Sequence, residues 1–197
     1  SVALHAVTRA GPLAGRRVIV TGSGPIGLLT MQAARFAGAI EVVATDVEDP
    51  PLRVAREKMG ATTVVNVAAK PDGLAPYAAE GGYFDVAFEV SGSPQALTSL
   101  FPVVRRGARI IQVGMLPPGA HPLPVNMLQT REIELAGAFR ANDEFRLAVD
   151  HIVSRRFDIT PILSGTYPLS DAATALEVAG DRSRHIKLHL QIDDSAA

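Results

Sequence analysis

Apolar residues in this chain gather in short runs that alternate with longer segments of helical periodicity. Several runs are continuous rather than alternating, which is typical of parallel strands in a sheet covered on both faces. The predicted strands are residues 16–21, 41–46, 62–67, 85–90, 108–113 and 133–139. Helices between successive strands, with right-handed crossovers, favour an α/β Rossmann fold, a doubly wound six-stranded parallel sheet in the order 3-2-1-4-5-6.

Helix-capping residues mark two of the predicted helices. Asp49 is a predicted N-cap that precedes two prolines, and Gly60 should end that helix. Ser93 is a predicted N-cap of a second helix, which Pro102 should end or kink because proline lacks the backbone N–H that a helix interior needs.

The C-terminal part of the chain does not continue the strand–helix alternation. Its predicted elements are a helix over 142–155, an extended segment over 161–168, a helix over 170–179 and a strand over 184–192. The last strand has no obvious slot in a sheet built from βαβ units. We therefore predict a nucleotide-binding domain over residues 1–140 and a C-terminal tail of helices and a strand over 141–197. Apolar side chains around Ile159, Ile162 and Leu163 are expected at the surface.

The first predicted strand runs directly into Gly22-Ser23-Gly24-Pro25-Ile26-Gly27, a G-x-G-x-x-G turn that opens a helix. An acidic residue, Asp46, closes the second strand 19 residues after Gly27. A glycine motif of this kind is weak evidence by itself. Here it lies between the strand and the helix that it requires, and an acid follows at the expected distance. Together they predict a dinucleotide-binding site.

Each residue of this motif has a physical role in such a site. Gly22 allows a sharp turn, Gly24 lets the backbone approach a diphosphate, and Gly27 lets the helix pack closely. The helix N-terminus offers N–H groups to phosphate, and the missing N–H of Pro25 is tolerated in a first turn. Asp46 would accept hydrogen bonds from ribose hydroxyls and repel a 2′-phosphate, which favours NAD over NADP. The alternative is an ordinary glycine-rich turn with a solvated Asp46.

Composition excludes several classes of function. The formal net charge is −1 and no basic stripe is evident, so a nucleic-acid partner is not expected. No apolar run approaches the ~20 residues of a membrane span, and no signal peptide is evident, so a cytoplasmic protein is expected. The sequence contains no Cys, which excludes disulfides, a thiol nucleophile and cysteine zinc ligands within it. The five His form no cluster, so we expect no metal site.

Further segments follow the glycine turn in a characteristic series. They are residues 83–92 (Tyr-Phe-Asp-Val-Ala-Phe-Glu-Val-Ser-Gly), 112–115 (Gln-Val-Gly-Met) and 137–140 (Gly-Ala-Phe-Arg). With these segments, the chain resembles the zinc-dependent polyol and alcohol dehydrogenases of the medium-chain dehydrogenase/reductase superfamily over essentially its whole length.

This resemblance implies NAD-dependent oxidation of a CH–OH group in a polyol or sugar acid. In that family a GroES-like catalytic domain carries the zinc ligands and precedes the coenzyme domain. The chain matches only the coenzyme domain and its C-terminal tail. We therefore expect it to bind NAD, to hold no catalytic residue and no metal ligand, and to be inactive alone.

The resemblance also implies cofactor contacts at the carboxyl ends of the later strands. The residues are Val90, Ser91 and Gly92 on the adenosine side, Val113, Gly114 and Met115 in the nicotinamide pocket, and Phe139 and Arg140 facing nicotinamide and substrate. An adenine contact for Arg53 and a diphosphate contact for Lys187 remain open.

Two other functions remain open. A zinc-free quinone oxidoreductase of the same superfamily would favour NADPH, against which Asp46 argues. A non-catalytic NAD-sensing module would belong to a different class. The predicted sixth strand, residues 133–139, would be an edge strand, and relatives pair such strands across a two-fold axis, so a homo-oligomer is expected.

Overall fold

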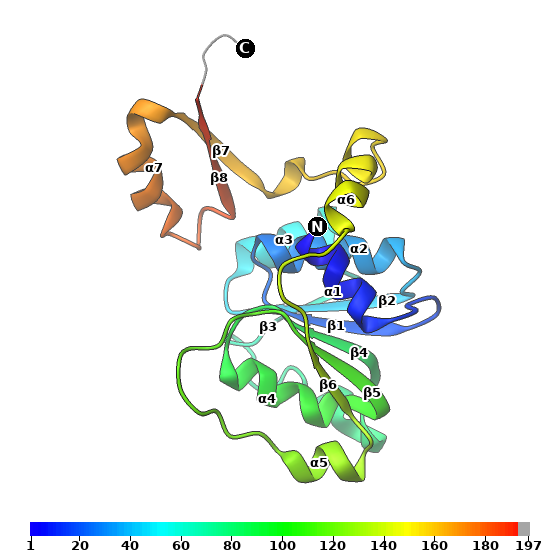
Figure 1. Cartoon of the computed structure of the whole chain (residues 1–197). Helices are drawn as coiled ribbons and strands as arrows, with labels where there is room; N and C mark the ends of the chain where they lie inside the picture. The colour runs from blue at the N-terminus through cyan, green and yellow to red at the C-terminus, as the bar shows by residue number, and fades with distance from the viewer. Residues whose placement is uncertain (193–197) are drawn as a thin grey trace.

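A computed structural model describes residues 1–192, and its centre is a six-stranded parallel sheet (Figure 1). The strand order is β3-β2-β1-β4-β5-β6, which confirms the predicted Rossmann topology. The strands are β1 Arg17–Thr21, β2 Glu41–Asp46, β3 Thr63–Asn66, β4 Phe84–Glu89, β5 Val104–Gln112 and β6 Glu134–Gly137. The first three strands extend the sheet to one side of β1, and the last three extend it to the other side, starting with β4. The carboxyl ends of β1 and β4 therefore form the topological switch point.

Helices cover both faces of the sheet because successive strand residues point to opposite sides. Val18 and Val20 of β1 pack in one apolar core with α1 (Val2–Ala10), α2 (Pro25–Phe36) and α3 (Asp49–Lys58). Ile19 lies between them in sequence but packs in the second core, with α4 (Pro94–Val103). A 3-10 segment, η1 (Ala75–Gly81), and α5 (Val125–Thr130) complete this second face. Within residues 1–192, no helix is long and apolar enough to cross a membrane.

The structure confirms one of the two predicted N-caps and contradicts the other. The Ser93 hydroxyl accepts a hydrogen bond from the Ala96 N–H at 3.3 Å, which confirms it as the N-cap of α4. Pro102 lies in the last turn of α4, which ends at the next residue. The prediction for Asp49 was wrong, because Glu48 is the N-cap of α3. The Asp49 carboxylate instead accepts a hydrogen bond from Asn66 Nδ2 at 2.6 Å.

The C-terminal tail forms its own small βαβ unit. Its elements are α6 Glu144–Val153, η2 Thr160–Ile162, β7 Leu163–Pro168, η3 Leu169–Asp171, α7 Ala172–Ala179 and β8 Lys187–Gln191. Strands β7 and β8 pair in parallel and form a separate two-stranded sheet, so the last strand finds its partner within the tail. Helix α6 packs on α1, and His5 Nδ1 lies 3.0 Å from Glu144 Oε1. The division at residue 140 stays a prediction.

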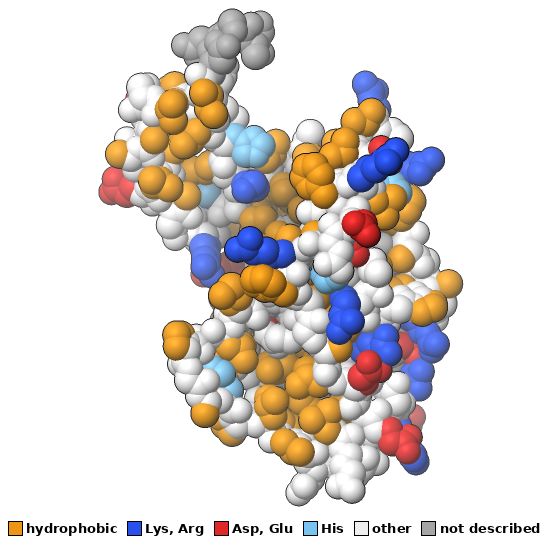
Figure 2. All heavy atoms as spheres, viewed as in Figure 1, with side chains coloured by type: hydrophobic (Ala, Val, Ile, Leu, Met, Phe, Trp, Pro, Cys, Tyr) orange, Lys and Arg blue, Asp and Glu red, His pale blue; other side chains and the backbone are white. Residues whose placement is uncertain are grey.

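The exposed apolar surface lies elsewhere than expected. Ile162 is buried and Leu163 is partly buried in the core that contains α1, α2 and α3, so the prediction of an exposed patch around them was wrong. Phe145 and Val153 of α6 and Leu176 of α7 are exposed instead. Figure 2 shows hydrophobic side chains at the surface over both of these helices.

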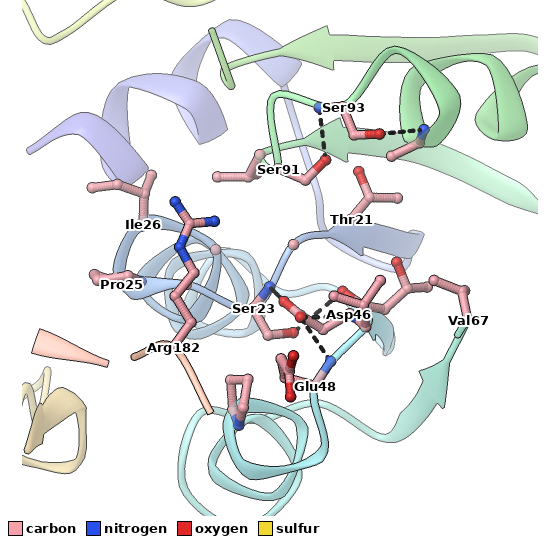
Figure 3. Close-up of a pocket in the computed structure, with 18 of the residues that line it drawn as sticks. Thr21, Ser23, Pro25, Ile26, Asp46, Glu48, Val67, Ser91, Ser93 and Arg182 are labelled. Carbon is pink, nitrogen blue, oxygen red and sulfur yellow. Dashed lines mark hydrogen bonds between the residues drawn. The ribbon is translucent and has the colours of Figure 1, made fainter. Parts of the chain in front are cut away.

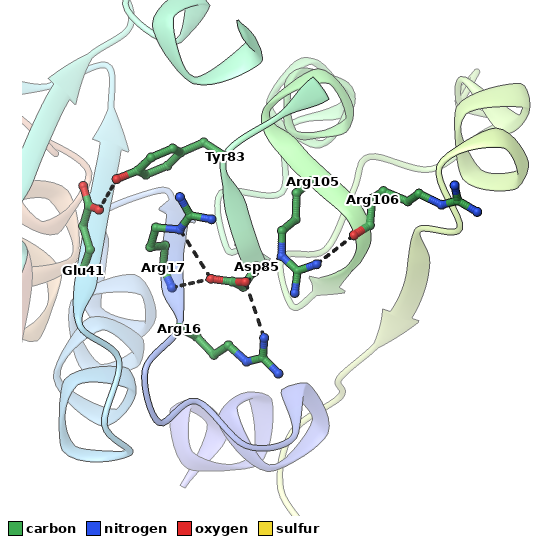
Figure 4. Close-up of polar contacts among 7 residues, drawn as sticks. All are labelled: Arg16, Arg17, Glu41, Tyr83, Asp85, Arg105 and Arg106. Carbon is green, nitrogen blue, oxygen red and sulfur yellow. Dashed lines mark hydrogen bonds and ion pairs between the residues drawn. The ribbon is translucent and has the colours of Figure 1, made fainter. Parts of the chain in front are cut away.

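Asp85 at the start of β4 joins three segments of the chain (Figure 4). Its carboxylate, which is 10% exposed, accepts hydrogen bonds from the Arg17 N–H at 2.7 Å and Arg105 Nε at 2.6 Å, and Arg16 lies 3.5 Å away. Burial by itself would raise the pKa of Asp85, but the hydrogen bonds and charges of Arg17 and Arg105 hold this pKa below its usual value.

Replacing Asp85 with asparagine should lower the free energy of unfolding by about 1–2 kcal/mol, because an amide cannot accept from every donor around it. Since the folded pKa is depressed, the carboxylate stabilises the fold above its ordinary pKa of 3.8, and this contribution is lost as the pH falls through the folded pKa. Urea unfolding between pH 2 and 7 measures both effects. The control is Glu132→Gln, which breaks the exposed pair with Arg106 and should change nothing measurable. Equal losses in both variants would contradict the prediction.

Candidate functional site

A cavity of about 850 Å³ opens at the carboxyl ends of β1, β2 and β4 (Figure 3). Its walls come from the glycine turn after β1, the segment after β2, the segment after β4 and the turn before β8. This is the topological switch point of the sheet, where open α/β sheets bind their ligands. The cavity is large enough for a ligand of nucleotide size.

The three glycines of the turn meet different surroundings. Gly22 has a φ of +90°, and a Cβ there would lie 2.8 Å from Ser91 Cα. Both the backbone conformation and the lack of space therefore require glycine at this position. A Cβ on Gly27 would lie 1.9 Å from the Gly22 carbonyl oxygen. A Cβ on Gly24 would meet no atom within 4 Å, and Gly24 lines the cavity. Gly22 and Gly27 therefore shape the turn, whereas the missing side chain of Gly24 leaves the cavity open.

The N-terminus of α2 faces this cavity. Gly24 is its N-cap, Pro25 occupies the first turn, and Ile26 and Gly27 follow along the cavity wall. N–H groups in a first turn have no acceptor inside the helix, and the helix dipole adds partial positive charge. The geometry therefore favours an anionic group at this end of the cavity.

Asp46 ties the glycine turn to the end of β2. Its Oδ2 accepts a hydrogen bond from the Ser23 N–H at 2.6 Å. Its Oδ1 accepts from the Val47 N–H at 2.8 Å and the Glu48 N–H at 3.1 Å. The carboxylate is thus held by backbone donors in one orientation at the cavity wall, as Figure 3 shows.

A second carboxylate, that of Glu89, is fully buried behind the cavity. It accepts hydrogen bonds from the Ser91 N–H at 2.8 Å, the Gly92 N–H at 3.0 Å and Gln112 Nε2 at 2.6 Å, and also from the Ser91 hydroxyl. These donors belong to the segment that follows β4 and to the last residue of β5. Glu89 therefore fixes two strand ends relative to each other.

The structure brings eight of the predicted site residues together in the cavity and leaves six outside its lining. The eight are Gly22, Gly24, Pro25, Ile26, Gly27, Asp46, Val90 and Ser91. The six are Gly92, Val113, Gly114, Met115, Phe139 and Arg140.

Of the six, Gly92 and Gly114 lie close together behind Ser91, because a Cβ on Gly114 would be 2.2 Å from the Gly92 nitrogen. Met115 and Phe139 are exposed, and the Arg140 guanidinium lies 5.3 Å from the centre of the Phe139 ring. The cofactor contacts of all fourteen residues stay predictions.

Two charged residues of the cavity were missed from the sequence. Glu48 follows Asp46 by two residues, and Arg182 comes from the turn before β8 (Figure 3). Arg182 carries no motif, and only the folding of the tail brings it above the α2 N-terminus. Lys187 lines a smaller neighbouring cavity of about 310 Å³, and Arg53 is exposed on α3 outside both cavities. Across residues 1–192, no group of three or more His, Asp or Glu side chains could hold a metal ion.

The chain is similar to several known dehydrogenases. It is 40% identical to L-idonate 5-dehydrogenase (NAD(P)(+)) of Escherichia coli K12 over 190 residues, which cover 96% of this chain and 54% of that protein. The crystal structure of the E. coli K-12 L-idonate 5-dehydrogenase superposes with a TM-score of 0.91 at 39% identity, over 97% of this chain and 54% of that one.

Two further relatives are similar to the chain at lower identity. The chain is 32% identical to a sorbitol dehydrogenase of Bacillus subtilis over 91% of this chain and 51% of that protein. A Sinorhizobium meliloti 1021 protein whose crystal structure contains NADP superposes with a TM-score of 0.85 at 28% identity, over 97% of this chain and 56% of that one.

The chain spans about half the length of the curated relatives it matches. A family model described as zinc-binding dehydrogenase matches residues 25–154, which begin at the α2 N-terminus and end after α6. The glycine turn, the switch-point cavity and this match agree with one another. The chain therefore belongs to the zinc-binding dehydrogenase family.

Proposed function

We propose that this chain is the NAD-binding part of a polyol or sugar-acid dehydrogenase similar to L-idonate 5-dehydrogenase. The observation that carries the proposal is the cavity that joins the α2 N-terminus to the fixed carboxylate of Asp46. Two of the relatives that the chain matches are named L-idonate 5-dehydrogenase and sorbitol dehydrogenase, which supports a sugar acid or a polyol as the substrate class. Zinc ligands and the proton relay would come from residues outside this sequence.

The groups that line the cavity fit the two parts of an adenosine diphosphate, which are its diphosphate and its ribose. The diphosphate would lie at the N–H groups of Ile26 and Gly27, below the Arg182 guanidinium. The adenosine ribose would lie beside Asp46, whose charge disfavours a 2′-phosphate. This arrangement supports NAD as the preferred cofactor.

The nicotinamide would extend toward the carboxyl ends of β4, β5 and β6. Bound there, NAD would accept a hydride from the substrate CH–OH group. The Glu89 hydrogen bonds hold the Ser91–Gly92 segment against the end of β5, so Val113 and Gly114 keep a fixed position beside it. The residues of this chain would thus bind and orient the cofactor.

The remaining expectations about the assembly stay proposals. β6 is the last strand of the sheet, with one neighbour, β5. An edge strand of this kind can pair with a second copy, which would give a dimer. We also propose a cytoplasmic location.

The chain should bind NADH while oxidising no polyol by itself. Arg182→Gln should weaken NADH binding by about two- to fivefold, because an exposed charge adds only modestly to diphosphate binding. Adenosine, which lacks the diphosphate, should bind the wild type and this variant equally. Titration calorimetry measures both, and Arg56→Gln, at an exposed position of α3 outside the cavity, is the matched control.

Two outcomes would contradict the proposal. One is a folded chain that shows no heat of binding with millimolar NADH. The other is polyol oxidation by this chain without any added domain, which would place the catalytic groups within it.

A further inference from the structure

We infer that Glu48 is a second recognition group for the adenosine ribose and contributes to the exclusion of a 2′-phosphate. The inference rests on the proposed binding of NAD. It concerns a residue that the glycine fingerprint does not include, since the fingerprint assigns the ribose to one acid at the end of the second strand.

The hydrogen bonds of Asp46 leave it short of acceptor sites. Each carboxylate oxygen can accept about two hydrogen bonds. Oδ1 already accepts two, from the Val47 and Glu48 N–H groups, and Oδ2 accepts one from the Ser23 N–H. One acceptor site remains, whereas a ribose diol presents two hydroxyl donors. Asp46 by itself therefore cannot bind both hydroxyls without giving up a backbone contact.

Glu48 provides the acceptors that Asp46 lacks. Its backbone N–H is bonded to Asp46 Oδ1 at 3.1 Å, which fixes its Cα beside the first carboxylate. Its side chain makes no capping bond to α3, and among residues 1–192 it makes no other hydrogen bond or ion pair. It lines the same cavity, and Figure 3 shows it between Ser23 and the start of α3.

A purely structural role for Glu48 is less consistent with these contacts. An acid near a helix N-terminus can stabilise the helix dipole. In α3 the first turn already contains Asp49, whose carboxylate is also bonded to Asn66. The Glu48 carboxylate is thus not needed to complete the hydrogen bonds of α3 and remains free to bind a ligand in the cavity.

The carboxylates of Asp46 and Glu48 also determine the local charge around a 2′-phosphate bound in this part of the cavity. Such a phosphate brings a charge of about −1.5 to −2. Asp46 and Glu48 are both negative, and the arginine that lines this cavity, Arg182, comes from the tail on the diphosphate side. Because Coulomb repulsion falls only slowly with distance inside a partly enclosed cavity, both acids should act on the phosphate.

The test is the binding of NADH and NADPH to the folded full chain by titration calorimetry. Glu48→Gln keeps the shape of the side chain and removes its charge. We expect it to weaken NADH binding by about two- to fivefold and to strengthen NADPH binding by about tenfold. Glu48→Ala should weaken NADH binding further, because it removes the acceptor as well. The control Glu57→Gln, at an exposed position of the same helix, should leave both affinities unchanged.

Each alternative outcome is distinguishable. A NADPH-to-NADH affinity ratio that is unchanged in Glu48→Gln but shifted in Asp46→Asn would overturn the inference and leave ribose recognition to Asp46. An equal shift in Glu57→Gln would reduce the effect to net charge and would also overturn it. A folded wild-type chain that binds neither dinucleotide would overturn the proposed function and, with it, this inference.

Discussion

Replacing Gly27 with alanine should destabilise the fold and abolish nucleotide binding together. A Cβ at this position would lie 1.9 Å from the Gly22 carbonyl oxygen, a backbone atom held in the turn by the Gly22 N–H bond to Thr45 O at 2.8 Å. Helix α2 must therefore move away from β1. Overpacking of this kind should cost about 2–4 kcal/mol of unfolding free energy. Urea unfolding, followed by circular dichroism, measures the loss.

Gly24→Ala is the matched comparison for this variant. The φ of Gly24 is −67°, which any residue adopts, and a Cβ there would meet no protein atom within 4 Å. Its stability should stay within about 1 kcal/mol of the wild type, the usual range for a glycine-to-alanine change at an N-cap. NADH affinity should nevertheless fall by tenfold or more, because the new methyl group would lie where the diphosphate approaches the backbone. Equal stability of the two variants would contradict the predicted difference between the two positions.

Glu89→Gln should have the second large effect. The carboxylate is fully buried, and every hydrogen bond that it makes is accepted from an N–H or O–H donor. A glutamine amide would turn its NH₂ group toward the Ser91 and Gly92 donors or toward Gln112, whichever way it is oriented. A buried donor without an acceptor costs about 1–3 kcal/mol, so we expect a loss of about 2–3 kcal/mol in unfolding free energy. NADH affinity should fall as well, because the Ser91–Gly92 segment loses its support.

The control for Glu89 is Glu134→Gln, which removes the charge of an acid that is 57% exposed in its pair with Arg109. It should unfold at nearly the wild-type urea concentration. A Glu89→Gln variant as stable as the wild type would contradict the prediction. Amide hydrogen exchange at Ser91 and Gly92 would show directly whether the segment after β4 has lost its support.

Local patterns predicted much of this architecture. The continuous apolar runs gave strands within a few residues of those observed, and the strand–helix alternation gave the sheet order. The glycine turn could be interpreted because steric limits on φ and on close backbone approach act within a few residues. The Ser93 cap was predictable for the same reason. Asp49 failed because its neighbour Glu48 has the extended backbone conformation of an N-cap, which composition alone does not reveal.

Contacts between segments that are distant in the sequence could not be predicted from local sequence patterns. Arg182, in the turn before β8, lines the same cavity as the glycine turn after β1 only in the folded chain. Ile162 is buried because η2 packs against α3 and joins the core on the α1, α2 and α3 side of the sheet. Each depends on residues more than 100 positions away in the chain, for which neither periodicity nor spacing carries a signal.

The sequence by itself determined a Rossmann sheet with a glycine turn and an acid at its switch point, because backbone sterics and strand periodicity are local properties. The tertiary structure decided how the acids act. It engaged Asp46 with three backbone N–H groups, buried Glu89 behind the strand ends and left Glu48 free at the cavity wall. The physical reason is that the role of a carboxylate depends on the donors around it, and those donors are brought together only by the folded chain.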